Sequence, residues 1–215
     1  MIKAHYEAVK DIIRDKAVLC AVTKRRSLQE IREYYDAGER IFAENRAQDL
    51  KERAAALPSD IRWQFIGHLQ RNKVKDIISF VDCIQSLDSL PLAAVIEKEA
   101  ARANRTVDVL VEFHLAEEDT NKSGLAKEDA FPFVREILKY EHLNLIGMMA
   151  MGPHTDNDDR IREVFEEARQ LFLSLRKEFG EDHFRVLSMG MSDDFRIAVE
   201  CGSTMVRIGT YLFEE

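Results

Sequence analysis

The sequence has few of the residues that interrupt regular secondary structure: its 215 residues include nine glycines and four prolines. Low-complexity and linker-like runs are also missing, which excludes a largely disordered chain. The three cysteines are an odd number at distant positions, and the six histidines lack the spacing of metal ligands. We therefore expect buried free thiols at Cys20, Cys83 and Cys201, and no metal site.

Long apolar runs and an excess of positive charge are missing as well. No stretch approaches the length of a membrane span, and the first residues lack the apolar core of a signal peptide, so we expect a cytoplasmic protein. The net charge of -8 argues against nucleic acid as the main partner, because binding to phosphates needs a basic surface. Apolar residues form 46% of the chain, and we expect one packed domain over 1–215, as a monomer.

Short apolar runs recur along the chain, and an amphipathic segment follows each of them. The predicted strands lie near residues 17–23, 40–43, 61–66, 81–85, 106–113, 143–149, 184–187 and 204–208. This alternation predicts an α/β fold, a single (β/α)8 TIM-type barrel with an additional N-terminal helix near 2–14. An open doubly wound sheet has the same local pattern. The positions of the unusual polar residues favour the barrel.

Capping residues mark several of the helices between these strands. Ser27 and Glu30 have the spacing of a capping box, and Gly38 ends that helix. Further amphipathic patterns predict a helix over about 45–57 and a long one over about 158–179.

Polar residues follow the carboxyl ends of the predicted strands, the end at which barrels of this class build their active sites. Lys24 follows the first strand and Asn45 the second. After the seventh strand, Gly190 permits close approach of the backbone, and the segment from Ser192 is expected to open a helix through Val199. Amides and a hydroxyl placed in this way bind phosphate, although an ordinary helix cap explains them equally well.

The eighth predicted strand adds to this cluster. Arg207 lies within an apolar strand and so needs a buried partner, and the amides of Gly209 and Thr210 follow it. Lys24 on its own is explained well by a solvated loop. An amine and a phosphate cradle at one barrel mouth together indicate a phosphorylated aldehyde such as pyridoxal 5'-phosphate, held as a covalent imine on Lys24 with Arg207 at its ring nitrogen.

Motifs in a fixed order along nearly the whole chain resemble those of the pyridoxal phosphate homeostasis proteins, which have the barrel fold of the N-terminal domain of alanine racemase. The motifs are AVTK at 21–24, ENR at 44–46, WQFIGHLQRNK at 63–73, KSG at 122–124, GMM at 147–149, LSMGMS at 187–192 and GSTMVRIG at 202–209. Four positions depart from the family pattern: Thr23 replaces a serine, Ala43 a glycine, His114 an asparagine and Glu214 a glycine.

The resemblance implies a protein that holds pyridoxal phosphate as a Schiff base and serves vitamin B6 homeostasis, buffering the cofactor or delivering it to apoenzymes. It implies that the polar residues after the third strand govern the rim there. The cofactor-binding residues that it implies are Lys24, Asn45, Ser192, Arg207, Gly209 and Thr210.

Two catalytic functions remain as alternatives. A weak amino-acid racemase needs a base on each face of the substrate carbon and an electron sink in the cofactor. The permanently charged Arg207 would weaken that sink, and 215 residues leave no room for the second domain of the related racemases. A barrel aldolase would instead form an imine between Lys24 and a sugar phosphate. We expect the carrier, with no catalytic residues.

Overall fold

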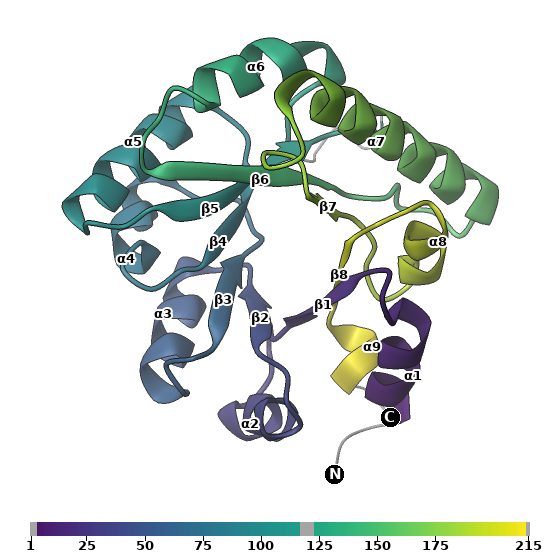
Figure 1. Cartoon of the computed structure of the whole chain (residues 1–215). Coiled ribbons are helices and arrows are strands. Elements are labelled where there is room, and N and C mark those ends of the chain that lie inside the picture. Colours follow the sequence, from purple (N-terminus) through teal and green to yellow (C-terminus); the bar gives the residue numbers. More distant parts are fainter. Residues whose placement is uncertain (1–3, 117–122, 214–215) are drawn as a thin grey trace.

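Eight parallel strands close into a barrel, and the structure, a computed structural model, describes residues 4–116 and 123–213 (Figure 1). The strands are β1 (Val18–Val22), β2 (Ile41–Glu44), β3 (Arg62–Phe65), β4 (Cys83–Leu87), β5 (Val107–Phe113), β6 (Leu143–Ala150), β7 (Val186–Ser188) and β8 (Met205–Ile208). β1 pairs with both β2 and β8, so the sheet has no open edge. The predicted barrel is confirmed, and the open doubly wound sheet is excluded.

Helices surround the barrel on its outside (Figure 1). They are α1 (Ala4–Ile13), α2 (Leu28–Asp36), α3 (Ala47–Ala56), α4 (Val74–Ile77), α5 (Leu90–Arg102), α6 (Ala130–Ile137), α7 (Asp158–Phe179), α8 (Phe195–Glu200) and α9 (Thr210–Phe213), with 3-10 turns at Arg71–Lys73 and Lys127–Asp129. The expected additional N-terminal helix is α1, which packs beside α9. Within the described ranges, no helix has the length and apolar character needed to cross a membrane.

Capping residues fix where α2 begins and where α7 begins and ends. Ser27 and Glu30 form both hydrogen bonds of the capping box at the start of α2. Asn157 accepts two backbone N–H bonds at the start of α7, and Gly180 ends that helix with a φ of +99°. Such a φ favours glycine because a Cβ would crowd the backbone.

The main apolar core lies between the strands and the helices, while the barrel interior holds two smaller apolar clusters. The first interior cluster contains Cys20, Val22, Ala43 and Met205, and the second contains Cys83, Leu110, Ile146 and Met149. Side chains alternate between the two faces of a strand. These clusters therefore identify the inward-pointing residues of β1, β2, β4, β5, β6 and β8. Cys20, Cys83 and Cys201 are buried free thiols, as predicted.

Candidate functional site

The carboxyl ends of β8, β1 and β2 lie side by side at the mouth of the barrel. Cys20 in β1 is opposite Arg207 in β8, and Val22 in β1 is opposite Ala43 in β2. Cys20 and Val22 point inward, and Lys24 follows Val22 by two residues in an exposed turn. This order brings the turn of Lys24 between the loops that follow β8 and β2.

Arg207 is a buried cation inside the barrel, with a side chain that is 3% exposed. Its Nη1 donates to the carbonyl oxygen and to the hydroxyl of Ser188, both at 2.8 Å, and its Nη2 donates to the Ala150 carbonyl at 3.1 Å. The expected buried partners are therefore present. Burial lowers the pKa of Arg207 from its ordinary value. These contacts use three of the five guanidinium N–H groups, so two have no partner among the described residues.

A chain of polar side chains continues from Arg207 across the barrel interior. The Ser188 hydroxyl donates to Gln85 at 2.7 Å, and Gln85 donates to the side-chain oxygen of Gln64. The Cys20 thiol lies 3.7 Å from that oxygen, and burial raises its pKa to about 12, so it remains a neutral donor. The chain satisfies the buried amides and fixes the position of Ser188 beneath the guanidinium.

The loop after β7 reaches the end of β8 through Ser192. The Ser192 hydroxyl oxygen accepts hydrogen bonds from the amides of Gly209 (3.4 Å) and Tyr211 (3.2 Å). Gly190 has a φ of +96°, and a Cβ there would lie 2.5 Å from the Cβ of Ala198, so only glycine fits this loop. Two amides and one hydroxyl thus converge at the mouth, in the manner of backbone anion sites.

The helix expected after the segment from Ser192 to Asp194 is present and includes Val199, but Ser192 is not its N-cap residue. α8 begins at Phe195, with Asp194 as its N-cap residue, and the Asp194 carboxylate accepts the amide of Met191 at 2.5 Å. The residues between Met191 and Asp194 form a turn before the helix. In this turn the Ser192 side chain points toward the end of β8 and not along α8. The hydroxyl is therefore placed for the mouth, and it does not cap the helix.

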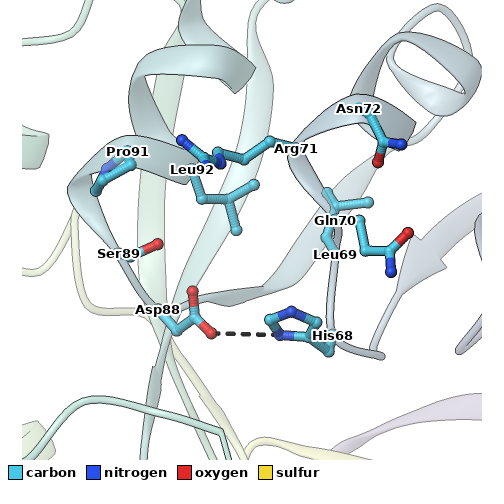
Figure 2. A pocket seen from close by; sticks show the side chains of 9 residues that line it. All are labelled: His68, Leu69, Gln70, Arg71, Asn72, Asp88, Ser89, Pro91 and Leu92. Atoms are coloured by element: carbon cyan, nitrogen blue, oxygen red, sulfur yellow. Dashed lines mark ion pairs between the residues drawn. The ribbon is translucent and has the colours of Figure 1, made fainter.

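Asn45 follows β2 and lines a cavity of about 290 Å³ on the rim, together with Lys73 and Gln70 from beyond β3. A second cavity of about 690 Å³ lies between the loops that follow β3 and β4. In that cavity His68 faces Asp88, with 3.7 Å between His68 Nδ1 and Asp88 Oδ2 (Figure 2). The polar residues after β3 therefore border the mouth, and the lining of these two cavities does not include Arg207.

A buried carboxylate, Glu112, lies one residue before the end of β5, two residues beyond the inward-facing Leu110. Its Oε1 accepts a hydrogen bond from the Ser123 hydroxyl at 3.0 Å, whereas its Oε2 is buried with no partner among the described residues. Burial raises the pKa of Glu112, and this outweighs the opposing attraction of Arg207. The sequence analysis did not identify Glu112, although an acidic residue in an apolar strand is a usable signal.

Some of the predicted site residues are in direct contact, and others share only their position at the same rim of the barrel. Ser192 and Gly209 are in contact, and Thr210 begins α9 directly after Gly209. Lys24, Asn45 and Arg207 lie on the neighbouring strands β1, β2 and β8 or just after them. No role was predicted for Gln64, Gln85 or Ser188, which are buried inside the barrel. Glu214 lies outside the described residues.

The fold and this mouth are those of a known class of barrels, because residues 1–215 match the family model described as alanine racemase, N-terminal domain. The protein of Helicobacter pylori named pyridoxal phosphate homeostasis protein is 38% identical over 200 residues, which cover 92% of this chain and 87% of the relative. The protein of the same name from Aquifex aeolicus is also 38% identical, over 93% of this chain and 87% of its own length. The chain belongs to the family of pyridoxal phosphate homeostasis proteins.

Solved structures agree with this membership. PipY of Synechococcus elongatus without pyridoxal phosphate superimposes with a TM-score of 0.94 at 30% identity, and the match covers 100% of both chains. PipY with pyridoxal phosphate bound superimposes with a TM-score of 0.89 at 29% identity, over 98% of both chains. The described residues are compatible with such a ligand, because Arg207 has N–H groups without a partner among them and the Ser192 hydroxyl meets the amides of Gly209 and Tyr211 just beyond β8.

Proposed function

We propose that this protein holds pyridoxal 5'-phosphate on Lys24 and serves intracellular vitamin B6 homeostasis, buffering the cofactor or delivering it to apoenzymes without significant catalysis. The observation that carries the proposal is the convergence of the Ser192 hydroxyl with the amides of Gly209 and Tyr211, two to four residues beyond buried Arg207 on β8. The family membership and the pyridoxal phosphate bound by PipY support it further.

In this proposal each residue has a separate task at the barrel mouth. The Lys24 amine attacks the aldehyde carbon, a C=N bond replaces the C=O bond, and water leaves. Ser192, Gly209 and Thr210 bind the phosphate, and Asn45 lines the cofactor from the side of β2. Arg207 donates a hydrogen bond to the ring nitrogen from one of its two remaining N–H groups.

Arg207 is also our reason for proposing a carrier rather than an enzyme. A guanidinium hydrogen-bonded to the ring nitrogen keeps that nitrogen unprotonated, which weakens the electron sink on which racemisation depends. The relatives from Helicobacter pylori and Aquifex aeolicus are named as homeostasis proteins. We further propose a monomer, because the barrel of a single chain closes without an open sheet edge. We propose that it lies in the cytoplasm, because the three buried thiols are free.

Borohydride trapping tests the assignment of the lysine. The purified protein incubated with pyridoxal phosphate should show an imine absorbance band, and reduction followed by peptide mapping should place the label on Lys24. Lys24→Ala should abolish both signals. Lys73→Ala, which removes another lysine at the rim, should leave them unchanged. Labelling at a different lysine would contradict the proposal.

Chiral analysis of amino acids after long incubation with the loaded protein tests the absence of catalysis. We expect no change in the ratio of enantiomers. Racemisation that disappears in Lys24→Ala would replace the carrier with a racemase, while cleavage of a sugar phosphate without added pyridoxal phosphate would favour an aldolase.

A further inference from the structure

The turn that carries Lys24 is held in an unfavourable conformation. The Arg26 amide donates to the Thr23 carbonyl at 3.0 Å and closes a four-residue turn around Lys24 and Arg25. Arg25 has a φ of +62°, in the left-handed region that residues with a Cβ rarely occupy. A turn of this kind persists only where surrounding contacts hold it in place.

One guanidinium from a different element supplies those contacts. Arg53 lies on α3, and its side chain is 12% exposed. Its Nη1 donates to the Thr23 carbonyl, and its Nη2 donates to the Arg26 carbonyl at 3.0 Å. The planar fork of Arg53 therefore binds both ends of the turn at once, on either side of Lys24.

A buried carboxylate holds Arg53 in this position. Glu44 ends β2, is fully buried, and pairs with Nη1 of Arg53. The Thr23 hydroxyl also donates to this carboxylate and lies 3.2 Å from the Ala43 carbonyl. Glu44 therefore balances the charge of Arg53 and connects it to the strand end beside the lysine turn. Arg53 and Glu44 belong to α3 and β2, so they fix the turn from outside β1.

We propose that Arg53 is a positioning residue for Lys24: by binding the carbonyls of Thr23 and Arg26, it holds the lysine turn in the conformation that presents the amine to the barrel mouth. This inference rests on the proposed function, in which the Lys24 amine condenses with the aldehyde of pyridoxal phosphate. Among the described residues, the partners of Arg53 are the backbone of the turn and Glu44, so in this proposal it acts through the turn and not on the reacting atoms. Its role is to lower the cost of ordering the amine, so it acts on imine formation and leaves phosphate binding unchanged.

The test compares two ligands in the variant Arg53→Lys, which keeps the charge opposite Glu44 and loses the fork. Pyridoxal phosphate measures phosphate binding together with imine formation, whereas pyridoxine 5'-phosphate has an alcohol in place of the aldehyde and measures phosphate binding alone. We expect the equilibrium constant for the imine, read from its absorbance across a pH series, to fall by about tenfold to a hundredfold. The dissociation constant of pyridoxine 5'-phosphate should match that of the wild type.

The control is Arg62→Lys, the same exchange at an exposed arginine that pairs with Asp82 at the start of β3. It should leave both ligands unaffected. Equal weakening of both ligands in Arg53→Lys would show a general structural role, and an unchanged imine constant would show that the fork is dispensable. Either outcome overturns the proposal. A wild-type protein that forms no imine on Lys24 would instead refute the proposed function itself.

Glu44→Gln provides a second variant if Arg53→Lys does not fold. The glutamine oxygen can still accept from Thr23 and Arg53, but the charge that orients the guanidinium is gone. We expect a smaller drop in the imine constant than in Arg53→Lys, with pyridoxine 5'-phosphate binding again unchanged. An imine constant equal to that of the wild type in a folded Glu44→Gln protein, together with full occupancy, would contradict the role of the pair.

Discussion

Two buried glutamates at opposite ends of the barrel differ in how well their charge is satisfied. Glu39 lies before β2, at the amino end, and both of its oxygens accept hydrogen bonds: Oε1 from the amides of Arg40 and Ile41, and Oε2 from Lys10 and Tyr6. Glu112 lies at the carboxyl end of β5, and only one of its oxygens has a partner among the described residues. The first glutamate stabilises the fold, while the desolvation cost of the second is only partly compensated by the described residues.

The same contrast extends to the cations of the two ends. At the amino end Arg62 pairs with Asp82 at 2.9 Å, and the arginine side chain is 54% exposed. At the carboxyl end Arg207 is 3% exposed, and the ion pairs found among the described residues do not include it. Proteins keep locally unfavourable arrangements mainly where function requires them. The difference is what the proposed ligand site at the carboxyl end would require.

Replacing Arg207 should produce the largest effect, and mainly on binding. Arg207→Met removes a hydrogen bond from a charged group to the cofactor, worth about 1.5–3 kcal/mol, so we expect the affinity for pyridoxal phosphate to fall by about tenfold to a hundredfold. Stability changes less, because relief of the buried charge offsets the loss of donors to Ser188 and Ala150. Absorbance titration and urea unfolding measure the two quantities. A large loss of stability with unchanged affinity would show that Arg207 has a structural role, and the difference between the two ends of the barrel would then not reflect a ligand site.

Ser192→Ala should weaken phosphate binding by about tenfold, because it removes one hydrogen bond to a charged ligand. The amides of Gly209 and Tyr211 lose their internal acceptor but remain available to phosphate. Competition between inorganic phosphate and pyridoxal phosphate reports this site separately from the lysine. Ser174→Ala, on the outside of α7, is the control, since that hydroxyl donates to the Gln170 carbonyl within its own helix. Identical phosphate affinity in wild type and Ser192→Ala would remove the serine from the site.

Glu112→Gln should increase stability at neutral pH, by on the order of 1 kcal/mol. Burial raises the pKa of Glu112 in the folded state, so the wild type is relatively most stable when this carboxyl is protonated. Its stability falls as the pH rises through that raised pKa, and the glutamine variant escapes the loss. The gain should disappear below about pH 4, where both states of the wild type are protonated.

Glu39→Gln is the opposing variant for this measurement, because it deprives Lys10 of its partner and should lower stability at neutral pH. Urea unfolding across a pH series measures both variants. A gain for Glu112→Gln that persists in acid, or a loss at neutral pH, would show that the carboxylate of Glu112 is well compensated after all.

The barrel could be predicted from the sequence because buried parallel strands are short apolar runs with turns between them. The capping box at Ser27 and the need of Arg207 for a buried partner were likewise local properties, and both are confirmed. The role of Ser192 was not a local property. Serine is a common N-cap residue, but the Ser192 hydroxyl accepts hydrogen bonds from amides that follow β8. This contact depends on how close the loops after β7 and β8 lie in the folded chain.

The residues whose roles were not predicted are those with side chains that bond to partners on other, distant parts of the chain. Arg53 lies on an amphipathic helix among other charges, and nothing in its neighbours indicates that its guanidinium turns back to Thr23 and Arg26. Gln85 occurs in a strand, but the pattern does not reveal that it bridges Ser188 to the far side of the interior. Long-range polar contacts of this kind become visible only once the barrel has closed.

Arg62→Met at the amino end should have the smallest effect. The ion pair of Arg62 with Asp82 is largely exposed to water, so its loss should cost at most about 1 kcal/mol, and the methionine retains part of the packing of the arginine stem. Binding of pyridoxal phosphate should be unchanged, because β3 begins at this residue, at the end of the barrel away from Lys24. Urea unfolding and absorbance titration, run beside Arg207→Met, make the comparison direct. If Arg62→Met weakened binding as much as Arg207→Met, burial would not be what distinguishes the two ends, and the ligand site would not be confined to the carboxyl end.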